Sequence, residues 1–230
     1  MCKSNLIVAL DYVDQASALR FVDTIEPEMC RLKIGKQLFV AAGPSLVELL
    51  IQRGFDVFLD LKFHDIPHTV AQAVKAAAAL GVWMLTLHAC GGERMLSAAY
   101  NALQHYRYRP RLIAVTVLTS MNPQDLQRLD WPSAAILAPR LAALAQHCAC
   151  DGVVCSGQEA ALIRGVCGSN FTLVVPGIRL DSIEKDDQTR VMTPQQALAA
   201  GADYLVIGRP ITTNIEPKRC LQLLNTQLNS

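Results

Sequence analysis

Eight short runs rich in β-branched residues alternate along the chain with stretches rich in alanine and leucine. Eight strand–helix units in one chain fit a closed (β/α)8 barrel better than an open doubly wound sheet. No GxGxxG motif follows the first run, which argues against a dinucleotide-binding sheet. We therefore predict an α/β fold, a (β/α)8 TIM barrel, forming a single domain over residues 1–230. The predicted strands are 6–11, 31–35, 57–63, 83–89, 111–119, 152–156, 172–178 and 204–209.

The stretches between these runs carry the apolar spacing of amphipathic helices. Residues 44–54 (PSLVELLIQRG) and 70–81 (VAQAVKAAAALG) show it clearly, and the second ends at Gly81, a residue suited to a helix C-cap. No linker, charge run or low-complexity segment divides the chain. The charged segment 180–192, between the last two predicted strands, is either a solvated loop or a lid that closes over a ligand.

The overall composition excludes several classes of protein. The formal net charge is +1, so no basic excess indicates nucleic-acid binding. No apolar run approaches the roughly 18–20 residues of a membrane span, and the N-terminus reaches Asp11 too soon for a signal peptide. The eight cysteines include no CxxC pair, which favours reduced, mostly buried thiols. We expect a cytoplasmic protein with no nucleic-acid or membrane partner.

Polar side chains lie in or at the ends of the predicted strands. Parallel barrel strands all point the same way, so we expect these side chains at the C-terminal mouth, where active sites of this fold are built. A single such residue would mean little, but eight around one rim indicate a site. They are Asp11, Lys33, Asp60, Lys62, Thr119, Ser156, Arg179 and Arg209.

The segment FLDLKFHDIP (58–67) places three charged residues in and just after an otherwise apolar strand. Because strand residues alternate sides, Asp60 and Lys62 share the face that would look into the barrel lumen. Asp65 lies just past the strand end, before Ile66 and Pro67. Ionised groups are costly to bury unless they are paired, so this segment needs either a structural or a chemical explanation.

A lysine flanked by carboxylates keeps its proton, because nearby opposite charges favour the ammonium form. Such a lysine suits the stabilisation of a developing anion and its protonation better than Schiff-base chemistry, which needs a depressed pKa. Two other interpretations stay open on the residues alone. One is a salt-bridge network that closes the barrel interior, and the other is an aldolase-type Schiff-base lysine.

The segments VVPGIR (174–179) and VIGRP (206–210) put glycine beside arginine at the ends of the last two predicted strands. Glycine allows backbone N–H groups to approach an oxyanion closely, and arginine supplies a planar charged fork. The loops after strands seven and eight are the usual phosphate site of these barrels. The pair of segments therefore predicts a phosphorylated small molecule as ligand.

The histidines do not predict a metal site. His64 and His68 flank Asp65, but HxxxH off a helix without a third ligand is a poor metal site. His88, in TLHACGG, is interpreted as a strand-end histidine with satisfied hydrogen bonds.

The combined motifs resemble the orotidine 5′-phosphate decarboxylase family, from about residue 6 to residue 213 and in the family's order. The DxKxxD pattern is specific to a small superfamily, and DLKFHDIP is more specific still. The motifs that carry the resemblance are VALD (8–11), RLKIGK (31–36), DLKFHDIP (60–67), VTVLTSM (115–121), VVPGIR (174–179) and VIGRP (206–210).

The resemblance implies a Lys–Asp–Lys–Asp catalytic array, which matches Lys33, Asp60, Lys62 and Asp65. It also implies a homodimer with shared sites, in which Asp65, Ile66 and Thr69 reach into the partner's site. The substrate would be orotidine 5′-phosphate (OMP), converted to UMP and CO2 in de novo pyrimidine nucleotide biosynthesis. Loss of CO2 would leave a carbanion at C6, which Lys62 stabilises and protonates, with no metal and no organic cofactor.

The resemblance assigns the remaining contacts to the two ends of the nucleotide. Ribose hydroxyls would be held by Asp11 and Lys33, and the pyrimidine edge by Ser156 with Thr119 nearby. The residues implied at the phosphate end are Arg179, Gln188, Gly208 and Arg209, with Gln188 carried on segment 180–192.

Two rival functions remain at this point. Sister barrels that act on sugar phosphates share DxKxxD but use Mg²⁺, with a glutamate where Lys33 stands, and a lysine there removes an oxygen ligand and adds positive charge. The second rival is a catalytically silent barrel that binds phosphosugars or nucleotides, which would need neither Asp60 nor Lys62.

Overall fold

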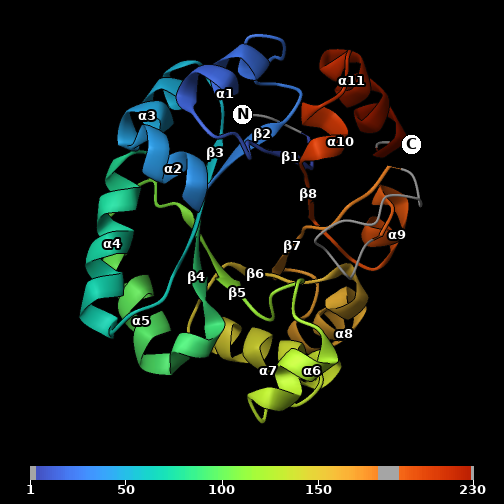
Figure 1. Ribbon diagram of the computed structural model, residues 1–230. Coiled ribbons are helices and arrows are strands. Elements are labelled where there is room, and N and C mark those ends of the chain that lie inside the picture. The colour runs from blue at the N-terminus through green and yellow to red at the C-terminus, as the bar shows by residue number, and fades with distance from the viewer. Residues whose placement is uncertain (1–3, 181–191, 229–230) are drawn as a thin grey trace.

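The computed structural model describes residues 4–180 and 192–228. Its centre is a closed barrel of eight parallel strands in the order β1 to β8, with each strand hydrogen-bonded to its sequence neighbours and β8 closing onto β1. Figure 1 shows helices surrounding this barrel. The predicted (β/α)8 barrel is therefore confirmed. The strands are β1 (Leu6–Ala9), β2 (Arg31–Gly35), β3 (Val57–Phe63), β4 (Met84–His88), β5 (Arg111–Val115), β6 (Gly152–Val154), β7 (Thr172–Val175) and β8 (Tyr204–Ile207).

The helices follow the strands along the chain, with more than one helix after several of them. No helix in residues 4–180 and 192–228 is long and apolar enough to cross a membrane. The helices are α1 (Gln15–Val22), α2 (Lys36–Ala42), α3 (Pro44–Gln52), α4 (Pro67–Ala79), α5 (Gly92–Ala102), α6 (Pro123–Arg128), α7 (Ala134–His147), α8 (Gly157–Cys167), α9 (Pro194–Ala199), α10 (Arg209–Thr212) and α11 (Pro217–Leu228), with a 3-10 turn η1 (Ala89–Gly91).

The element bounds correct several sequence-based predictions. The strands predicted at 31–35 and 57–63 have those bounds, but the other six are shorter than predicted. As a result Asp11, Thr119, Ser156, Arg179 and Arg209 lie beyond the strands that they were predicted to end. The reason is that the chain soon stops pairing with the neighbouring strands after a barrel strand ends, although its composition is still typical of a strand.

Helix α4 shows what sets the ends of one helix. It begins at Pro67, three residues before the predicted start, because proline at the first helical position lacks only an N–H that would be unpaired anyway. At the other end Leu80 is the C-cap residue and Gly81 follows with φ +81°. A left-handed residue directly after the C-cap is the conformation that glycine adopts without strain, as predicted for this position.

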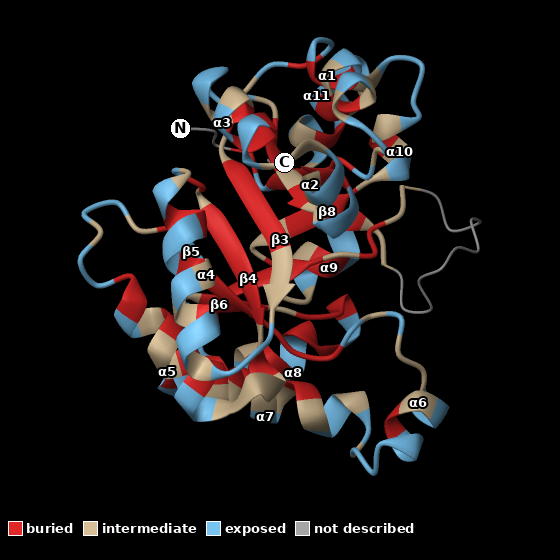
Figure 2. Ribbon diagram, turned by 60° about the vertical axis from the view of Figure 1, so that its left-hand side comes forward, coloured by how far each residue is buried: buried red, intermediate tan, exposed pale blue. Residues whose placement is uncertain are grey.

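The apolar core has two layers, separated by the strand alternation. The larger layer lies between the barrel and the helices, and Figure 2 shows the strands mostly buried with exposed surface on the helices. The smaller layer fills the lumen. Its buried members are Ile7, Ala9, Phe58, Met84, Ile113, Val174 and Val206.

The amino-terminal end of the lumen is closed by aromatic and cationic side chains. The rings of Trp83 and Tyr204 pack edge to face with their centroids 5.2 Å apart, and the Arg31 guanidinium lies 4.3 Å from the Trp83 ring centroid. Cation–π and edge-to-face contacts of this kind suit a plug that is polar on its outer side. With this end filled, the carboxyl end of the strands is where the lumen opens to a ligand.

The described residues include seven cysteines with free thiols, and five of these cysteines are buried. Their burial agrees with the predicted mostly buried thiols.

Candidate active site

A cavity of about 230 Å³ opens at the carboxyl end of the barrel strands. Its apolar floor includes Phe58 and Val174 of the lumen core. Eight of the residues predicted from the sequence line it together. They are Asp11, Lys33, Asp60, Lys62, Thr119, Arg179, Gly208 and Arg209.

The charged side chains on one side of the cavity form a continuous chain of ion pairs. The Lys33 ammonium lies 3.4 Å from an Asp11 carboxylate oxygen and 3.6 Å from Asp60 Oδ2. Asp60 Oδ2 also accepts a hydrogen bond from Lys62 Nζ at 2.8 Å. The side chain of Asp60 is only 10% exposed, whereas that of Asp11 is 65% exposed, so the chain runs from solvent into the barrel. The alternation predicted for 57–63 thus brings Asp60 and Lys62 together.

Asp60 is the buried centre of this arrangement. Burial alone would raise the pKa of its carboxyl, but the opposite charges of Lys33 and Lys62, together with hydrogen bonds from Lys62 and Thr86, hold that pKa below its usual value. Asp60 is therefore ionised at neutral pH. The Lys33 and Lys62 ammonium groups both line the cavity beside this carboxylate, where they could stabilise an anion.

The backbone of β3 departs from regular strand geometry at its carboxyl end. Its pairing with β4 shifts register between Leu59 and Phe63, and Lys62 has φ +52°. Figure 2 shows the same end of β3 less buried than the rest of the strand. A left-handed backbone is costly for a side chain other than glycine and persists only where its surroundings impose it. The shift aims the Lys62 ammonium at the cavity, as local irregularities in strands beside functional sites commonly do.

Thr86 of β4 is a contact that the sequence-based reasoning missed. Its hydroxyl donates to Asp60 Oδ1 and accepts the Lys62 backbone N–H, both at 2.9 Å. The only available signal was that Thr86 lies two residues after Met84 and so shares the face of β4 that looks into the lumen. That signal is weak because threonine is a common strand residue.

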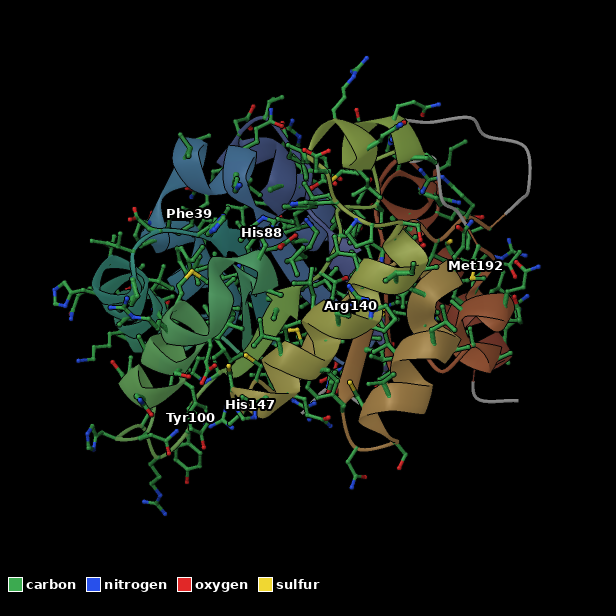
Figure 3. All side chains as sticks on the ribbon, turned by 90° about the horizontal axis from the view of Figure 1, so that it is seen from below. Phe39, His88, Tyr100, Arg140, His147 and Met192 are labelled. Carbon is green, nitrogen blue, oxygen red and sulfur yellow. The ribbon has the colours of Figure 1, made fainter. Side chains whose placement is uncertain are left out.

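Another part of the cavity wall combines glycine and arginine from the chain after β7 and β8, with Gly208 beside Asp11. Gly177 has φ +78°, a conformation that favours glycine, and lines the cavity with Arg179, Gly208 and Arg209. The Arg179 N–H donates to the Met192 carbonyl at 3.0 Å, and the Met192 N–H donates to the Gly177 carbonyl at 3.2 Å. Met192 and His88, labelled in Figure 3, lie on different sides of the barrel. The glycine and arginine residues predicted to bind an anion thus line the same cavity as the charged array.

Comparison with known proteins decides the family. The model of the orotidine 5′-phosphate decarboxylase / HUMPS family matches residues 4–222. The chain belongs to this family.

Full-length relatives agree with this family membership. The chain is 56% identical over 227 residues to an orotidine 5′-phosphate decarboxylase of Laribacter hongkongensis, covering 99% of this chain and 94% of that protein. It is 54% identical over 225 residues to one of Saccharophagus degradans, covering 97% and 94%. A crystal structure of orotidine 5′-phosphate decarboxylase from Lactobacillus acidophilus superposes with a TM-score of 0.86 at 34% identity, covering 98% of this chain and 99% of that one.

Some residues that the orotidine 5′-phosphate decarboxylase family resemblance assigns to the site do not line the cavity of this single chain. Asp65, Ile66 and Thr69 are exposed at the start of α4, and Asp65 Oδ1 accepts the N–H of Ile66 at 2.6 Å. Ser156 is buried and caps α8, its hydroxyl accepting the Gln158 N–H at 3.3 Å. Gln188 lies outside the described residues, as does most of the predicted lid at 180–192. The roles of these residues stay predictions.

His88 lies beside the charged array, at the end of β4. Burial lowers the pKa of His88 to about 4, and the positive charges of His64, Lys36 and Lys62 add to this effect while Asp60 opposes it. The His64 and His88 rings lie 5.5 Å apart, centroid to centroid. His88 is therefore neutral at physiological pH and contributes no charge to the site. This member of the orotidine 5′-phosphate decarboxylase family thus relies on lysine ammonium groups for positive charge on that side.

The lowered pKa of His88 predicts a pH dependence of stability. Between its ordinary pKa of 6.5 and about 4 the unfolded chain binds a proton at this residue that the folded chain does not, so stability falls as the pH falls through this window. Between pH 7.5 and pH 5 the melting temperature of His88→Asn, measured by thermal unfolding, should fall less than that of wild type. The exposed His105, changed to Asn, serves as the control and should follow wild type. Equal losses in all three proteins would contradict the lowered pKa.

Proposed function

We propose that the chain decarboxylates orotidine 5′-phosphate to UMP and CO2, in the de novo synthesis of pyrimidine nucleotides in the cytoplasm. The observation that carries the proposal is the single cavity in which Lys33, Asp60 and Lys62 form one wall and glycine–arginine segments form another. A nucleoside monophosphate fits this division, because its ribose separates the phosphate from the reacting carbon of its base. Membership of the orotidine 5′-phosphate decarboxylase / HUMPS family supports the same substrate.

The proposed chemistry centres on Lys62. When the C6–carboxylate bond breaks, its electron pair stays on C6 and CO2 leaves. The Lys62 ammonium, which donates a hydrogen bond to Asp60 at 2.8 Å, stabilises this carbanion and then transfers a proton to C6. Asp60 orients Lys62 through this hydrogen bond. The negative charge of Asp60 also repels the substrate carboxylate, and loss of CO2 relieves this repulsion.

The other residues predicted for the site would hold the rest of the nucleotide. We assign the ribose hydroxyls to Asp11 and Lys33, which form an ion pair at the open side of the cavity. Arg179, Gly208 and Arg209 would bind the phosphate, with Gln188 joining them from the 180–192 segment. Thr119 and Ser156 would face the pyrimidine edge. Contacts to the phosphate, remote from C6, supply binding energy that can support the chemical step.

We further propose that the working unit is a homodimer with shared sites. In this chain Asp65, Ile66 and Thr69 are exposed at the start of α4 and do not line their own cavity, and Ile66 is 66% exposed. Their exposure leaves these side chains accessible to a second subunit. Asp65 would then complete the Lys–Asp–Lys–Asp array in the partner's site.

The nearest rival is a Mg²⁺-dependent sugar-phosphate enzyme on the same barrel. The Lys33 ammonium lies between Asp11 and Asp60 and would repel a divalent cation from the carboxylates that could bind it. In residues 4–180 and 192–228 no group of three or more His, Cys, Asp or Glu side chains is arranged to hold a metal ion. Neither a metal nor an organic cofactor is required by the proposed chemistry.

The function is tested by a spectrophotometric assay on orotidine 5′-phosphate with EDTA present. We expect turnover to UMP, with the rate in EDTA within about twofold of the rate without it, because no oxygen-ligated metal takes part. Activity that disappears with EDTA and returns with Mg²⁺ would favour the sugar-phosphate rival. Binding of UMP without any conversion of orotidine 5′-phosphate would favour a silent nucleotide-binding barrel.

A further inference from the structure

Thr86 is a fully buried hydroxyl directly beneath the charged wall of the cavity. It lies in the middle of β4, is 0% exposed, and does not line the cavity itself. A buried hydroxyl without partners is costly, so its surroundings must satisfy it. Both of its partners belong to the two residues on which the proposed chemistry depends.

The hydrogen bonds of Thr86 link the side chain of Asp60 to the backbone of Lys62. The hydroxyl has one proton to give and donates it to Asp60 Oδ1 at 2.9 Å. It accepts the Lys62 N–H at 2.9 Å. Asp60 Oδ2 is then left to face Lys62 Nζ at 2.8 Å and Lys33 Nζ at 3.6 Å. One hydroxyl therefore decides which carboxylate oxygen faces the ammonium groups.

The same hydroxyl also bonds the β3 backbone where the sheet is irregular. Between Leu59 and Phe63 the β3–β4 pairing shifts register, so Lys62 lacks a regular position in the ladder. Its N–H donates a hydrogen bond to the Thr86 side chain. Lys62 has φ +52°, which a lysine keeps only when its surroundings hold it there. Thr86 is the side chain that provides this restraint from the neighbouring strand.

We propose that Thr86 is a positioning residue for the reaction, fixing the Asp60 carboxylate and the strained Lys62 backbone so that the Lys62 ammonium points at the reacting carbon. This inference rests on the proposed decarboxylation. Thr86 acts through Asp60 and Lys62 and does not touch the substrate. Its effect is therefore expected in the chemical step rather than in nucleotide binding, because binding energy comes mainly from the phosphate and ribose contacts on other residues.

Two substitutions separate the hydroxyl from the shape of the side chain. Thr86→Val keeps the branched shape but leaves the Asp60 oxygen and the Lys62 N–H without their shared partner. Thr86→Ser keeps the hydroxyl and loses one methyl group. Thr116→Val is the matched control, because Thr116 is also buried beside a barrel strand and its hydroxyl donates to the Val154 carbonyl at 3.0 Å, away from the array.

The experiment measures kcat and KM for orotidine 5′-phosphate, together with the affinity and stoichiometry of UMP binding by calorimetry. We expect Thr86→Val to lower kcat by about 10- to 100-fold with KM changed less than about threefold. Thr86→Ser should recover most of that loss, and Thr116→Val should stay within about threefold of wild type. Full UMP stoichiometry in Thr86→Val would show that the loss is not a misfolded fraction.

Each outcome separates the inference from the proposed function. If wild type shows no turnover of orotidine 5′-phosphate, the proposed function fails and the inference falls with it. If wild type is active and Thr86→Val matches Thr116→Val in kcat, the inference alone is overturned. A Thr86→Val loss that Thr86→Ser does not relieve would also overturn it, because the hydroxyl would not be the group responsible.

Discussion

Lys62→Ala is expected to abolish decarboxylation while UMP binding survives. The substitution removes both the charge that stabilises the carbanion and the proton donor, so we expect kcat to fall by at least about 10³-fold. The ribose and phosphate contacts lie on other residues of the cavity, including Asp11 and Arg209. UMP affinity should therefore stay within about tenfold of wild type. Turnover is followed by the absorbance of orotidine 5′-phosphate and binding by calorimetry.

Lys75 offers a matched control for this substitution. It is an exposed lysine on α4, away from the cavity, and Lys75→Ala should keep wild-type turnover. Near-wild-type turnover in Lys62→Ala would contradict the assigned role of Lys62. Loss of UMP binding together with turnover would instead indicate that Lys62 is mainly a binding residue.

Mixed dimers of Asp65→Ala and Lys62→Ala subunits should recover activity that neither variant has alone. If each site combines Lys62 of one subunit with Asp65 of the other, a hybrid dimer contains one intact site and one site lacking both residues. After random exchange, half of the dimers are hybrids with one working site in two, so about a quarter of wild-type activity per subunit should return. The measurement is turnover after mixing, with exchange verified by differently tagged subunits.

The control for the mixed dimers is a pair that should not complement. Asp60→Ala subunits mixed with Lys62→Ala subunits form such a pair. Each site takes Asp60 and Lys62 from the same β3 strand, so every site in a hybrid dimer lacks one of the two side chains. Recovery in this pair, or no recovery in the Asp65→Ala pair after proven exchange, would contradict a site shared between subunits.

The barrel and most of the cavity wall could be predicted from the sequence because strand alternation is a local property. Asp60 and Lys62 are two residues apart, so any regular strand puts them on one face, and the structure has both at the cavity. Glycine and arginine after the last two strands are likewise brought together by the topology of a closed barrel. These predictions needed only the order and direction of the strands.

The missed features depend on neighbours in space rather than in sequence. Thr86 matters because its hydroxyl accepts the Lys62 N–H where the register of β3 and β4 shifts. Nothing in the local sequence of β4 encodes that shift. The left-handed backbone of Lys62 arises in the same way. Ser156 was predicted to end a strand, yet it caps α8, because serine suits both a strand end and a helix N-cap.

The contribution of Asp65 illustrates a different limit. Its position just after β3 is clear from the sequence, and the structure has it exposed and bonded to its own neighbour Ile66. A single chain contains no information on which carboxylate of a second subunit would approach Lys62. The mixed-dimer experiment therefore tests whether the site is shared between subunits.

The central claim, that Lys62 stabilises a carbanion at C6 and exchanges a proton with it, is tested most directly by hydrogen exchange into UMP. In D2O, the neutral amine form of Lys62 takes the proton from C6 and leaves the electron pair on that carbon. The ammonium group so formed exchanges its protons with solvent, and return of a deuteron to C6 restores the amine and gives a C6–D bond that NMR detects. We expect wild type to accelerate this exchange over buffer and Lys62→Ala to leave it at the buffer rate, at concentrations where both proteins are saturated with UMP. Exchange at the wild-type rate in Lys62→Ala would contradict the claim.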